Sequence, residues 1–584
     1  MPKAKGITNY KLRMTEQDPA GGRGVGAASP VGYNTHRGAS MMRSRNSLWI
    51  VCGLVGAGFG DAMTVRGADL AVISVSPGRH ALNVPRDSRI VVEFDKAVKP
   101  ESVVPVRSFW AFGRWSGTVA GTFGFSNEDR TVTLTPNQPF SAGEPVMVIL
   151  SHDLEATDGT KLRAAGYSYQ FWTRARPTPM DFTQIAVMST RAAGETQTTA
   201  YGGIASDLDG DRFLDLTIVN EETADLRVFL NRADHTGLYH DFIQPTFAVG
   251  FHASPSEPSD FDRDGIVDIC VANILDSSVS ILLGNGDGTF APQQKITVGL
   301  RPRGIAVLDL DGDGDVDIAN TNYVSTSGDV SLLVNDGSGV FGAPTFFEAG
   351  ANGEWALGAA DMNDDGILDL VVGAQTAQRV VVQLGTGAGS FTFASSQNSD
   401  GNVWMLNTGD LDGNGTEDVA VGNSGSNRAA ILLGDGAGNL GLPQRYLTDP
   451  FTIATDLGDL DGDGDLDWVT SSYSGDWWVF TNDGDGTFTF SREFNSSIAA
   501  SCAIMLDFDN DGDLDLALID EEDDQVILMK NSGTTLIPTV SAWGLAALGL
   551  SLLAAGTIIT FRRRPQGPPS SPQRSRALGL TARG

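Results

Sequence analysis

Short apolar runs separated by turn-forming residues recur through the second two thirds of the chain. Runs such as GIAVLDL from Gly304, LDLVVG from Leu368 and LDLALID from Leu514 are six or seven residues long and rich in valine, isoleucine and leucine. They are too short for paired helices, and their composition predicts buried strands. Glycine-rich segments that predict hairpin turns follow at regular distances. These segments are GNGDGTF from Gly284, NDGSGVF from Asn335, GTGAGSF from Gly385, GDGAGNL from Gly434 and NDGDGTF from Asn482.

Each repeat of about 50 residues therefore contains four predicted strands, A to D. Four-stranded units that repeat at this period predict a β-propeller. The last unit has only three strands, because it stops near Asn531. An unpaired strand over residues 182–190 precedes the first unit and can supply the missing strand D, which hides two open sheet edges. We therefore predict a seven-bladed propeller over residues 182–533.

The segment before the propeller has a different pattern. Residues 69–175 contain short alternating strands separated by turn residues, for example TVTLTPNQPF from Thr131 and YSYQFWT from Tyr167. This pattern predicts a β-sandwich of about 100 residues. The segment resembles the bacterial Ig-like modules of surface-layer and envelope proteins, which usually serve as spacers. Residues 176–181 form the predicted linker, so the expected fold class is all-β.

Acidic side chains are concentrated in seven nonapeptides, one per predicted blade. The chain has 584 residues and a formal net charge of −32, which argues against nucleic acid as a partner. The seven windows together hold 31 acidic side chains and two arginines, a net charge of −29. The windows are DLDGDRFLD from Asp207, DFDRDGIVD from Asp260, DLDGDGDVD from Asp309, DMNDDGILD from Asp361, DLDGNGTED from Asp410, DLDGDGDLD from Asp459 and DFDNDGDLD from Asp507.

Such clusters of carboxylates predict a bound cation. Two carboxylates about 4 Å apart repel by about 4 kcal/mol at an effective dielectric constant near 20. Ca²⁺ prefers six to eight hard oxygen ligands, and the glycine at position 6 permits a tight loop. We expect up to seven Ca²⁺ ions, one per blade, held by side chains at positions 1, 3, 5 and 9 of each window. These are Asp207, Asp209, Asp211 and Asp215; Asp260, Asp262, Asp264 and Asp268; Asp309, Asp311, Asp313 and Asp317; Asp361, Asn363, Asp365 and Asp369; Asp410, Asp412, Asn414 and Asp418; Asp459, Asp461, Asp463 and Asp467; and Asp507, Asp509, Asp511 and Asp515.

Two alternatives to this interpretation are an EF-hand and a set of plain acidic turns. An EF-hand needs a glutamate at position 12 and a helix on each side. Position 12 is never acidic here, and the flanks predict strands. It is Ile218, Val271, Asn320, Val372, Val421, Thr470 or Leu518.

The repeats resemble the FG-GAP/VCBS repeats of integrin α-subunit propellers and of many bacterial surface proteins. The resemblance implies that the loops bind structural Ca²⁺ on one face, here called the loop face, while ligands meet the opposite upper face. Three windows depart from the pattern: Arg212 replaces glycine at position 6, and Asn363 and Asn414 replace aspartates at positions 3 and 5. The first loop is the most divergent.

Residues near the upper face are candidates for ligand binding. The residue six places before each window lies near the channel mouth if strand A descends to the loop, and the turns between strands B and C emerge on the same side. Aromatic rings there can stack on sugars or on a partner's side chains. The candidates are Tyr201, Arg303, Tyr323, Trp355, Trp404, Tyr473 and Trp477. The alternative is that Trp355 and Trp404 only pack between blades.

The termini predict export. Residues 1–68 read as a leader and signal peptide with the apolar stretch LWIVCGLVGAGF from Leu48. Residues 537–564 resemble an IPTL-CTERM sorting signal of Gram-negative bacteria: a short motif, a transmembrane helix and a basic stop, handled by an exosortase-like enzyme. Residues 565–584 read as a disordered tail. We expect a membrane-anchored or cell-surface protein, with Cys270 and Cys502 as free thiols.

Two functions of different classes follow from these features. The first is a non-catalytic, calcium-binding surface protein that binds a glycan or protein ligand, as in adhesion. The second is a secreted polysaccharide-active hydrolase or lyase on a propeller scaffold. The sequence contains no phosphate-binding loop, zinc-protease motif or nucleophile elbow. We therefore expect a binding protein and predict no catalytic residue.

Overall fold

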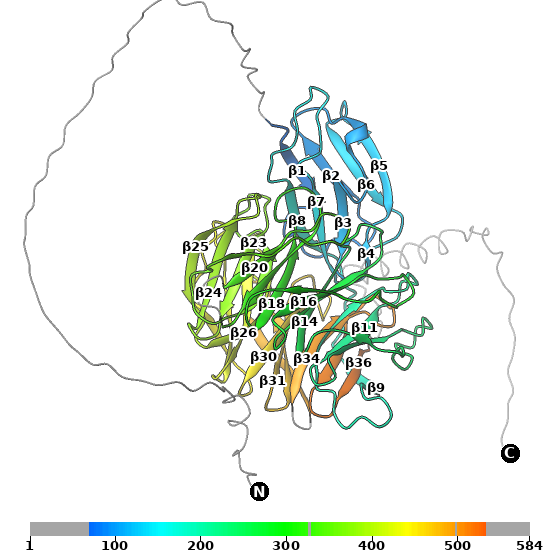
Figure 1. The fold of residues 1–584 in the computed structure, drawn as a ribbon, viewed down its shortest axis with the longest axis vertical. Coiled ribbons are helices and arrows are strands. Elements are labelled where there is room, and N and C mark those ends of the chain that lie inside the picture. Colours follow the sequence, from blue (N-terminus) through cyan, green and yellow to red (C-terminus); the bar gives the residue numbers. More distant parts are fainter. Residues whose placement is uncertain (1–68, 325–328, 497–498, 533–584) are drawn as a thin grey trace, which may run out of the picture. The chain divides into compact units, whose positions relative to one another are not determined.

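The structure is a computed structural model that describes residues 69–324, 329–496 and 499–532 (Figure 1). The predicted leader and signal peptide, sorting motif, transmembrane helix and tail lie outside the described residues. Within the described ranges, no helix has the length and apolar character needed to cross a membrane. The one helical element there is a 3-10 turn at Pro100–Ser102.

The N-terminal part is a sandwich of two four-stranded antiparallel sheets. The first sheet has the order β1 (Val72–Ser76), β2 (Ile90–Phe94), β6 (Thr131–Pro136), β5 (Gly121–Ser126). The second has the order β4 (Gly117–Thr118), β3 (Phe109–Gly113), β7 (Pro145–Leu150), β8 (Tyr167–Trp172). Alternate side chains of β2 and β6, including Val92 and Leu134, meet Phe109 and Phe171 in one core. This two-layer arrangement is that of an Ig-like domain.

Seven further four-stranded sheets follow. Blades 1 to 3 are β10 (Ala200–Ser206), β11 (Asp215–Asn220), β12 (Asp225–Phe229) and β13 (Phe247–Ala248); β14 (Ala253–Ser259), β15 (Asp268–Asn273), β16 (Ser278–Leu282) and β17 (Gln294–Thr297); and β18 (Pro302–Leu308), β19 (Asp317–Asn322), β20 (Val330–Leu333) and β21 (Thr345–Phe347). Blades 4 to 6 are β22 (Glu354–Ala360), β23 (Asp369–Ala374), β24 (Arg379–Gly385) and β25 (Phe391–Asn398); β26 (Asn402–Gly409), β27 (Asp418–Ser424), β28 (Arg428–Leu432) and β29 (Gln444–Leu447); and β30 (Thr452–Gly458), β31 (Asp467–Ser472), β32 (Asp476–Asn482) and β33 (Phe488–Asn495).

The seventh blade is closed by the strand predicted from the sequence. It has the order β34 (Ala500–Leu506), β35 (Asp515–Asp520), β36 (Gln525–Asn531), β9 (Phe182–Ser189). Figure 1 shows β9 beside β36, although the two strands are more than 300 residues apart in sequence. The innermost strand of each blade contacts that of the next, and β34 contacts β10. The ring is therefore a closed seven-bladed β-propeller, as predicted.

Hydrogen bonds at the loop face tie each blade to the one before it. Nδ2 of Asn482 donates to Leu411 O of the preceding blade at 2.8 Å and to Leu466 O of its own blade at 3.2 Å. Asn335 and Asn531 make the same pair of bonds in their blades. In blade 5, which has Gly434 at this position, Gly438 N donates to Met362 O, a backbone bond that blade 3 also makes from Gly339 N to Phe261 O. The blades are thus held together by backbone carbonyls that would otherwise lack partners.

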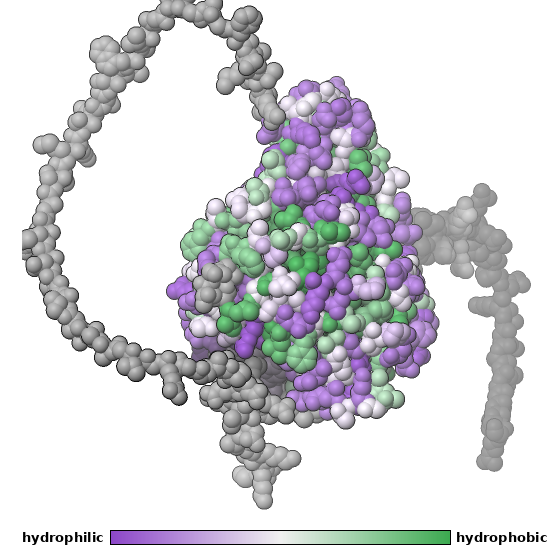
Figure 2. All heavy atoms as spheres, in the orientation of Figure 1, coloured by the Kyte–Doolittle hydropathy of each residue, from purple (hydrophilic) through white to green (hydrophobic). Residues whose placement is uncertain are grey.

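Some exposed apolar side chains come from the outermost strands, as with Phe346, Phe393, Leu447 and Phe490, and others come from loops and turns. On the face that Figure 2 shows, hydrophobic and hydrophilic residues lie side by side. Single exposed apolar residues of this kind are normal for a folded protein.

Candidate metal loops and channel mouths

Each acidic loop contains two residues in the left-handed region, at positions 4 and 6 of the nonapeptide. Position 6 is glycine in six loops, and in the first loop Arg212 adopts the same conformation with φ 75°. Position 4 is occupied by Gly210, Arg263, Gly312, Asp364, Gly413, Gly462 and Asn510, all with positive φ. Arg212 N still donates to Asp207 Oδ2 at 3.1 Å. The divergent first loop therefore keeps the geometry of the others.

The carboxylates at positions 1 and 9 shape the loop. Asp260, at position 1, accepts hydrogen bonds from Asp264 N and Gly265 N at 3.1 and 3.0 Å. Asp268, at position 9, begins strand β15 and accepts bonds from Phe261 N and Gly284 N at 2.8 and 2.7 Å. The position-9 aspartates of the other blades accept the equivalent amides. The same residue therefore fastens the acidic loop to the turn that follows strand C.

Carboxylate oxygens at positions 1, 3 and 9 converge. In the loops that start at Asp207, Asp260, Asp309 and Asp410, one oxygen from each of these positions lies within 4.8 Å of the other two. The side chain at position 5 bonds locally, since Asp264 Oδ1 accepts from Ile266 N at 2.8 Å. Three of the four predicted side chains thus share a centre, and position 5 lies at its edge.

In the absence of a cation, burial disfavours the charged form of these carboxylates. It raises the pKa of Asp215, Asp268 and Asp418 to about 8, although two backbone amides oppose the shift at each. Oδ1 of Asp311 is buried and has no hydrogen-bond partner among the described residues. A buried set of hard oxygen donors in a tight loop fits Ca²⁺.

The Ig-like domain and its linker contact all seven loops. Backbone bonds join loop 1 to Trp115 and loop 6 to Thr178, and a side-chain bond from Thr118 Oγ1 reaches Asp260 Oδ2 of loop 2 at 2.6 Å. Trp110 Nε1 donates to Gly314 O of loop 3 at 3.0 Å. Ser168 N donates to Gly366 O of loop 4 at 2.9 Å. The expectation that this domain is only a spacer is wrong, because it covers the loop face.

His80 of the Ig-like domain bridges loops 4 and 5. Its Nδ1 lies 2.7 Å from Glu417 Oε1 and its Nε2 lies 3.0 Å from Asp364 Oδ1. Burial disfavours the imidazolium, but the hydrogen bond and charge of Glu417 outweigh it and raise the pKa of His80 to about 9. Sequence reasoning missed this residue, since a lone histidine that is 284 residues from Asp364 and 337 residues from Glu417 carries no local signal.

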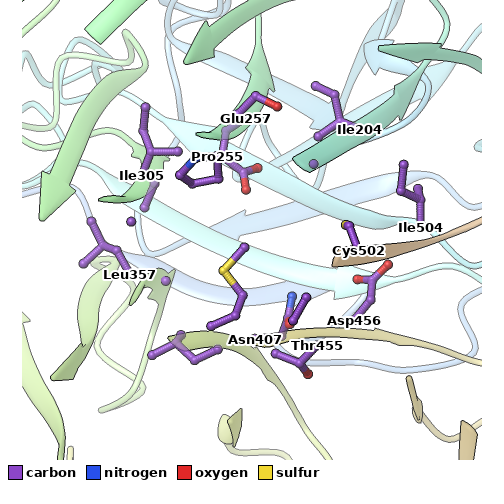
Figure 3. Close-up of a pocket in the computed structure, with 18 of the residues that line it drawn as sticks. Ile204, Pro255, Glu257, Ile305, Leu357, Asn407, Thr455, Asp456, Cys502 and Ile504 are labelled. Atoms are coloured by element: carbon purple, nitrogen blue, oxygen red, sulfur yellow. The ribbon is translucent and has the colours of Figure 1, made fainter. Parts of the chain in front are cut away.

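The central channel contains a cavity of about 250 Å³ lined by the innermost strands and by the Ig-like domain. Figure 3 shows Glu257, Asp456 and Cys502 among the side chains that line it. Arg114 Nη2 of the Ig-like domain pairs with Glu257 Oε2 at 3.0 Å. Burial raises the pKa of Asp456 to about 6, while Arg114 opposes the shift. Cys270 and Cys502 are both free thiols, as predicted.

The opposite mouth of the channel is filled by aromatic residues at β-bulges. The register of every innermost strand shifts at the residue six places before the acidic window, among them Tyr201, Trp355 and Trp404. A bulge re-aims the side chain of its extra residue. The ring centroids of Trp355 and Trp404 are 4.3 Å apart, and Trp404 Nε1 donates to the Tyr201 hydroxyl at 2.8 Å.

Other predicted mouth residues join this cluster. The Arg303 guanidinium lies 3.9 Å from the ring centroid of Trp355, whose edge meets Tyr323 at 4.7 Å between centroids. Tyr473 contacts Trp404 and Tyr201, with centroids 6.1 and 6.5 Å apart. Trp355 is only 6% exposed and packs between the neighbouring blades 3 and 5, which was the alternative interpretation for this residue.

Trp477 does not belong to the mouth. It is fully buried between blades 6 and 7, and its Nε1 donates to Cys502 O at 2.8 Å. Its place in the sequence next to a short turn suggested exposure, but the residue lies in β32 and faces the neighbouring blade. Its prediction as a ligand-binding residue is wrong.

Two glutamates in the turns between strands B and C lie beside the aromatic cluster. Burial raises the pKa of Glu221 to about 7, against the pull of Arg303. Burial also raises the pKa of Glu521, and the charge of Glu221 adds to the rise. His252 Nε2 lies 3.1 Å from Glu221 Oε2. Sequence reasoning missed this pair because acidic turns are frequent throughout the chain.

The fold and the loops define a repeat-built β-propeller joined to an Ig-like module. The chain contains FG-GAP-like repeats, matched at residues 260–319, 361–421, 410–470 and 459–518, and a bacterial Ig-like domain, matched at residues 67–173. This combination fits a cell-surface or extracellular repeat protein. A comparison with curated proteins gives no match.

Solved structures with a similar fold are remote. One is BBS1N in complex with ARL6DN, at 12% identity and TM-score 0.44, covering 61% of this chain and 98% of that one. A second is an Agrocybe aegerita protein that recognises non-reducing terminal N-acetylglucosamine, at 17% identity and TM-score 0.38, covering 69% and 94%. A third is a putative 6-phosphogluconolactonase from Bacteroides uniformis, at 13% identity and TM-score 0.41, covering 68% and 98%. None carries a function over to this chain.

Proposed function

We propose that the protein is an exported, cell-surface, calcium-binding propeller that binds a glycan or protein ligand without catalysis. The observation that carries the proposal is the convergence of buried carboxylates in loops on one face of the ring. Ca²⁺ would be held there by Asp260, Asp262 and Asp268 and by their equivalents in other blades, and would neutralise their repulsion. Millimolar extracellular calcium would fill even weak sites, which agrees with an exported location.

The upper face is the proposed ligand surface. The loop face is covered by the Ig-like domain, whereas Trp404 and Tyr473 keep part of their surface exposed at the opposite mouth. Partly exposed aromatic rings that neighbouring rings hold in place suit stacking on a sugar ring or a partner's side chain.

A glycan array and a panel of extracellular-matrix proteins, probed with the full chain, test this surface. Trp404→Ala should reduce binding at least tenfold, because it removes the central ring of the mouth. Trp478→Ala is the control, since Trp478 is half-buried on a more outward strand against Phe480 and Phe490. Equal binding by wild type and Trp404→Ala would place the ligand elsewhere, and binding of nothing on either panel would count against the adhesion role.

A polysaccharide-active hydrolase or lyase is the second candidate. The observation in its favour is the pair Glu221 and Glu521, two carboxyl groups with raised pKa beside the mouth, since a general acid must stay protonated near neutral pH. Release of reducing or unsaturated ends from a polysaccharide panel, lost in Glu221→Gln, would support it. No release by wild type would leave the binding role.

The termini complete the proposal. Membrane anchorage through residues 542–561 and recognition of residues 537–544 by an exosortase-like enzyme remain predictions, because both segments lie outside the described residues. Cell fractionation of the full chain and of a variant truncated after residue 536 tests them. The full chain should be found in the membrane or at the cell surface, and the truncated chain in the soluble fraction.

A further inference from the structure

Lysine 530 occupies a position that is uncharged in the other six blades. It is the penultimate residue of β36 and directly precedes Asn531, whose N donates to the position-9 carboxylate of Asp515. The residues that precede the equivalent amide donors in blades 1 to 6 are Leu230, Leu283, Val334, Leu384, Leu433 and Thr481. Blade 7 therefore differs from the other six blades by a charged residue at this position.

The Lys530 ammonium lies inside the seventh acidic loop. Its Nζ contacts Asp509 Oδ2 at position 3 and lies 3.7 Å from Asp511 Oδ2 at position 5. The side chain of Asp509 is 1% exposed and that of Lys530 is 29% exposed, so the carboxylate of this ion pair is shielded from water while the lysine is partly exposed. Leu433, the equivalent residue of blade 5, lies with the position-3 residue Asp412 around Gly486 instead. The lysine thus places a positive charge where the other blades have a methyl or hydroxyl group.

A second protein cation reaches the same loop from the interdomain linker. Arg176 Nη2 lies 3.0 Å from Asp511 Oδ1 and 2.5 Å from Asp513 Oδ2. Two of the four predicted calcium ligands of this loop, at positions 3 and 5, therefore face a lysine or an arginine. Among the ion pairs of the described residues, no other joins a lysine or arginine to position 3 or 5 of an acidic loop.

We propose that the seventh loop is neutralised by Lys530 and Arg176 in place of Ca²⁺, so that the chain binds one calcium ion fewer than it has loops. The inference rests on the proposed calcium function of the other loops. A calcium ion at loop 7 would have to displace the ammonium from Asp509 and compete with it for the same oxygens at close range, where like charges repel strongly. The donor set of this loop therefore does not fit Ca²⁺.

The position of Lys530 in the blade that closes the ring gives this lysine a structural role. Blade 7 closes the ring, because β36 pairs with β9 from the start of the propeller, with Lys530 opposite Thr183. Arg176 lies six residues before β9 and also donates its backbone amide to Gly512 O. The ion pairs of Lys530 and Arg176 with the seventh loop hold the ring closed even where calcium is too scarce to fill the remaining loops.

Calcium stoichiometry of the full chain tests the inference. After removal of metal with a chelator and dialysis against millimolar Ca²⁺, bound calcium is measured by elemental analysis for the wild type, Lys530→Leu and Leu433→Lys. Lys530→Leu copies blades 1, 2, 4 and 5 and should gain one calcium per chain. Leu433→Lys transplants the lysine into blade 5 and should lose one.

Equal calcium content in the wild type and Lys530→Leu would overturn the inference. Absence of calcium from the wild type would overturn the calcium function itself, so the two failures are distinguishable. If Lys530→Leu fails to fold, Lys530→Thr, which copies blade 6, takes its place. The melting temperature in chelator is a second readout. Lys530→Leu should melt at least 5 °C below the wild type without calcium and should recover when calcium is added. An equal melting temperature of the two proteins in chelator would contradict the role of the Lys530 ion pair in closing the ring.

Discussion

Backbone conformation decides which residues suit positions 4 and 6 of the acidic loops. Both positions adopt positive φ in every blade. A side chain other than glycine or asparagine is strained there by about 1–2 kcal/mol. Arg212 at position 6 of loop 1 carries this strain, with its side chain exposed and φ 75°.

Arg212→Gly should therefore stabilise the protein by about 1 kcal/mol, since the strain that is relieved exceeds the added freedom of glycine in the unfolded chain. Chemical denaturation at saturating calcium measures the change. Arg263→Gly is the matched control at position 4 of loop 2, with φ 62°. It should give no gain, because Arg263 also pairs with Asp315 and donates to Gly337 O. A loss of stability in Arg212→Gly would contradict the strain argument.

At this scale the sequence predicts the site well where the signal is local. Glycine at position 6 is visible in six of the seven windows, and aspartates at positions 1, 3 and 9 are visible in every window except that Asn363 stands at position 3 of loop 4. The left-handed conformation at position 4 was missed, because this position is Arg263, Asp364 or Asn510 in three of the loops and so shows no consistent glycine. Counting six residues back from each window located the channel mouth correctly, because every innermost strand has a bulge at that point. The same counting said nothing about Trp477, whose orientation depends on the neighbouring blade.

At the scale of elements, turn asparagines connect one blade to the next. Asn482 binds the carbonyls of Leu411 and Leu466, and its own amide binds Asp467. Removing its side chain would leave two buried carbonyl groups without a partner, at a cost of about 1–3 kcal/mol.

Asn482→Ala should lower the free energy of unfolding by about 2 kcal/mol, as measured by denaturant titration in calcium. Asn439→Ala is the control, because Asn439 is exposed and bonds only to Asp435 within its own turn. It should cost less than about 0.5 kcal/mol. Equal effects of the two substitutions would show that the bond across the blades contributes nothing.

The arrangement of these elements was predictable from period and strand count, including the closing strand. The covering of the loop face was not. Trp110 and Gly314, or His80 and Glu417, come from domains with separate patterns, and complementarity between two folded surfaces leaves no periodicity in the sequence. Only the even spread of contacts over all seven loops reveals that the Ig-like domain is part of the site.

At the scale of the whole molecule, the pair Arg114–Glu257 joins the Ig-like domain to blade 2 inside the channel, where the side chain of Arg114 is 40% exposed and that of Glu257 is 21% exposed. Removing one partner of such a pair leaves a charge without compensation, whereas removing both is less costly. Arg114→Met should destabilise the full chain by about 1 kcal/mol, because solvent screens a partly exposed pair, and Arg114→Met with Glu257→Gln by less. A thermodynamic cycle from chemical denaturation measures the coupling. Strictly additive effects would indicate that the pair does not fasten the two domains.

The propeller and the Ig-like domain should unfold as one unit and release their calcium together, because the loops lie between the two domains. Binding to the native state alone stabilises it by mass action and relieves the repulsion among buried carboxylates. The full chain would then show a single cooperative transition in calcium and a weaker, broader one in chelator.

The thermal midpoint of the full chain in millimolar Ca²⁺ and in excess chelator is the most direct test of the calcium loops. We predict a midpoint at least 10 °C higher with calcium, with Mg²⁺ unable to replace it, since Mg²⁺ demands a smaller and more regular site. An unchanged midpoint would contradict the account, because the converging carboxylates would then hold no cation that matters to the fold.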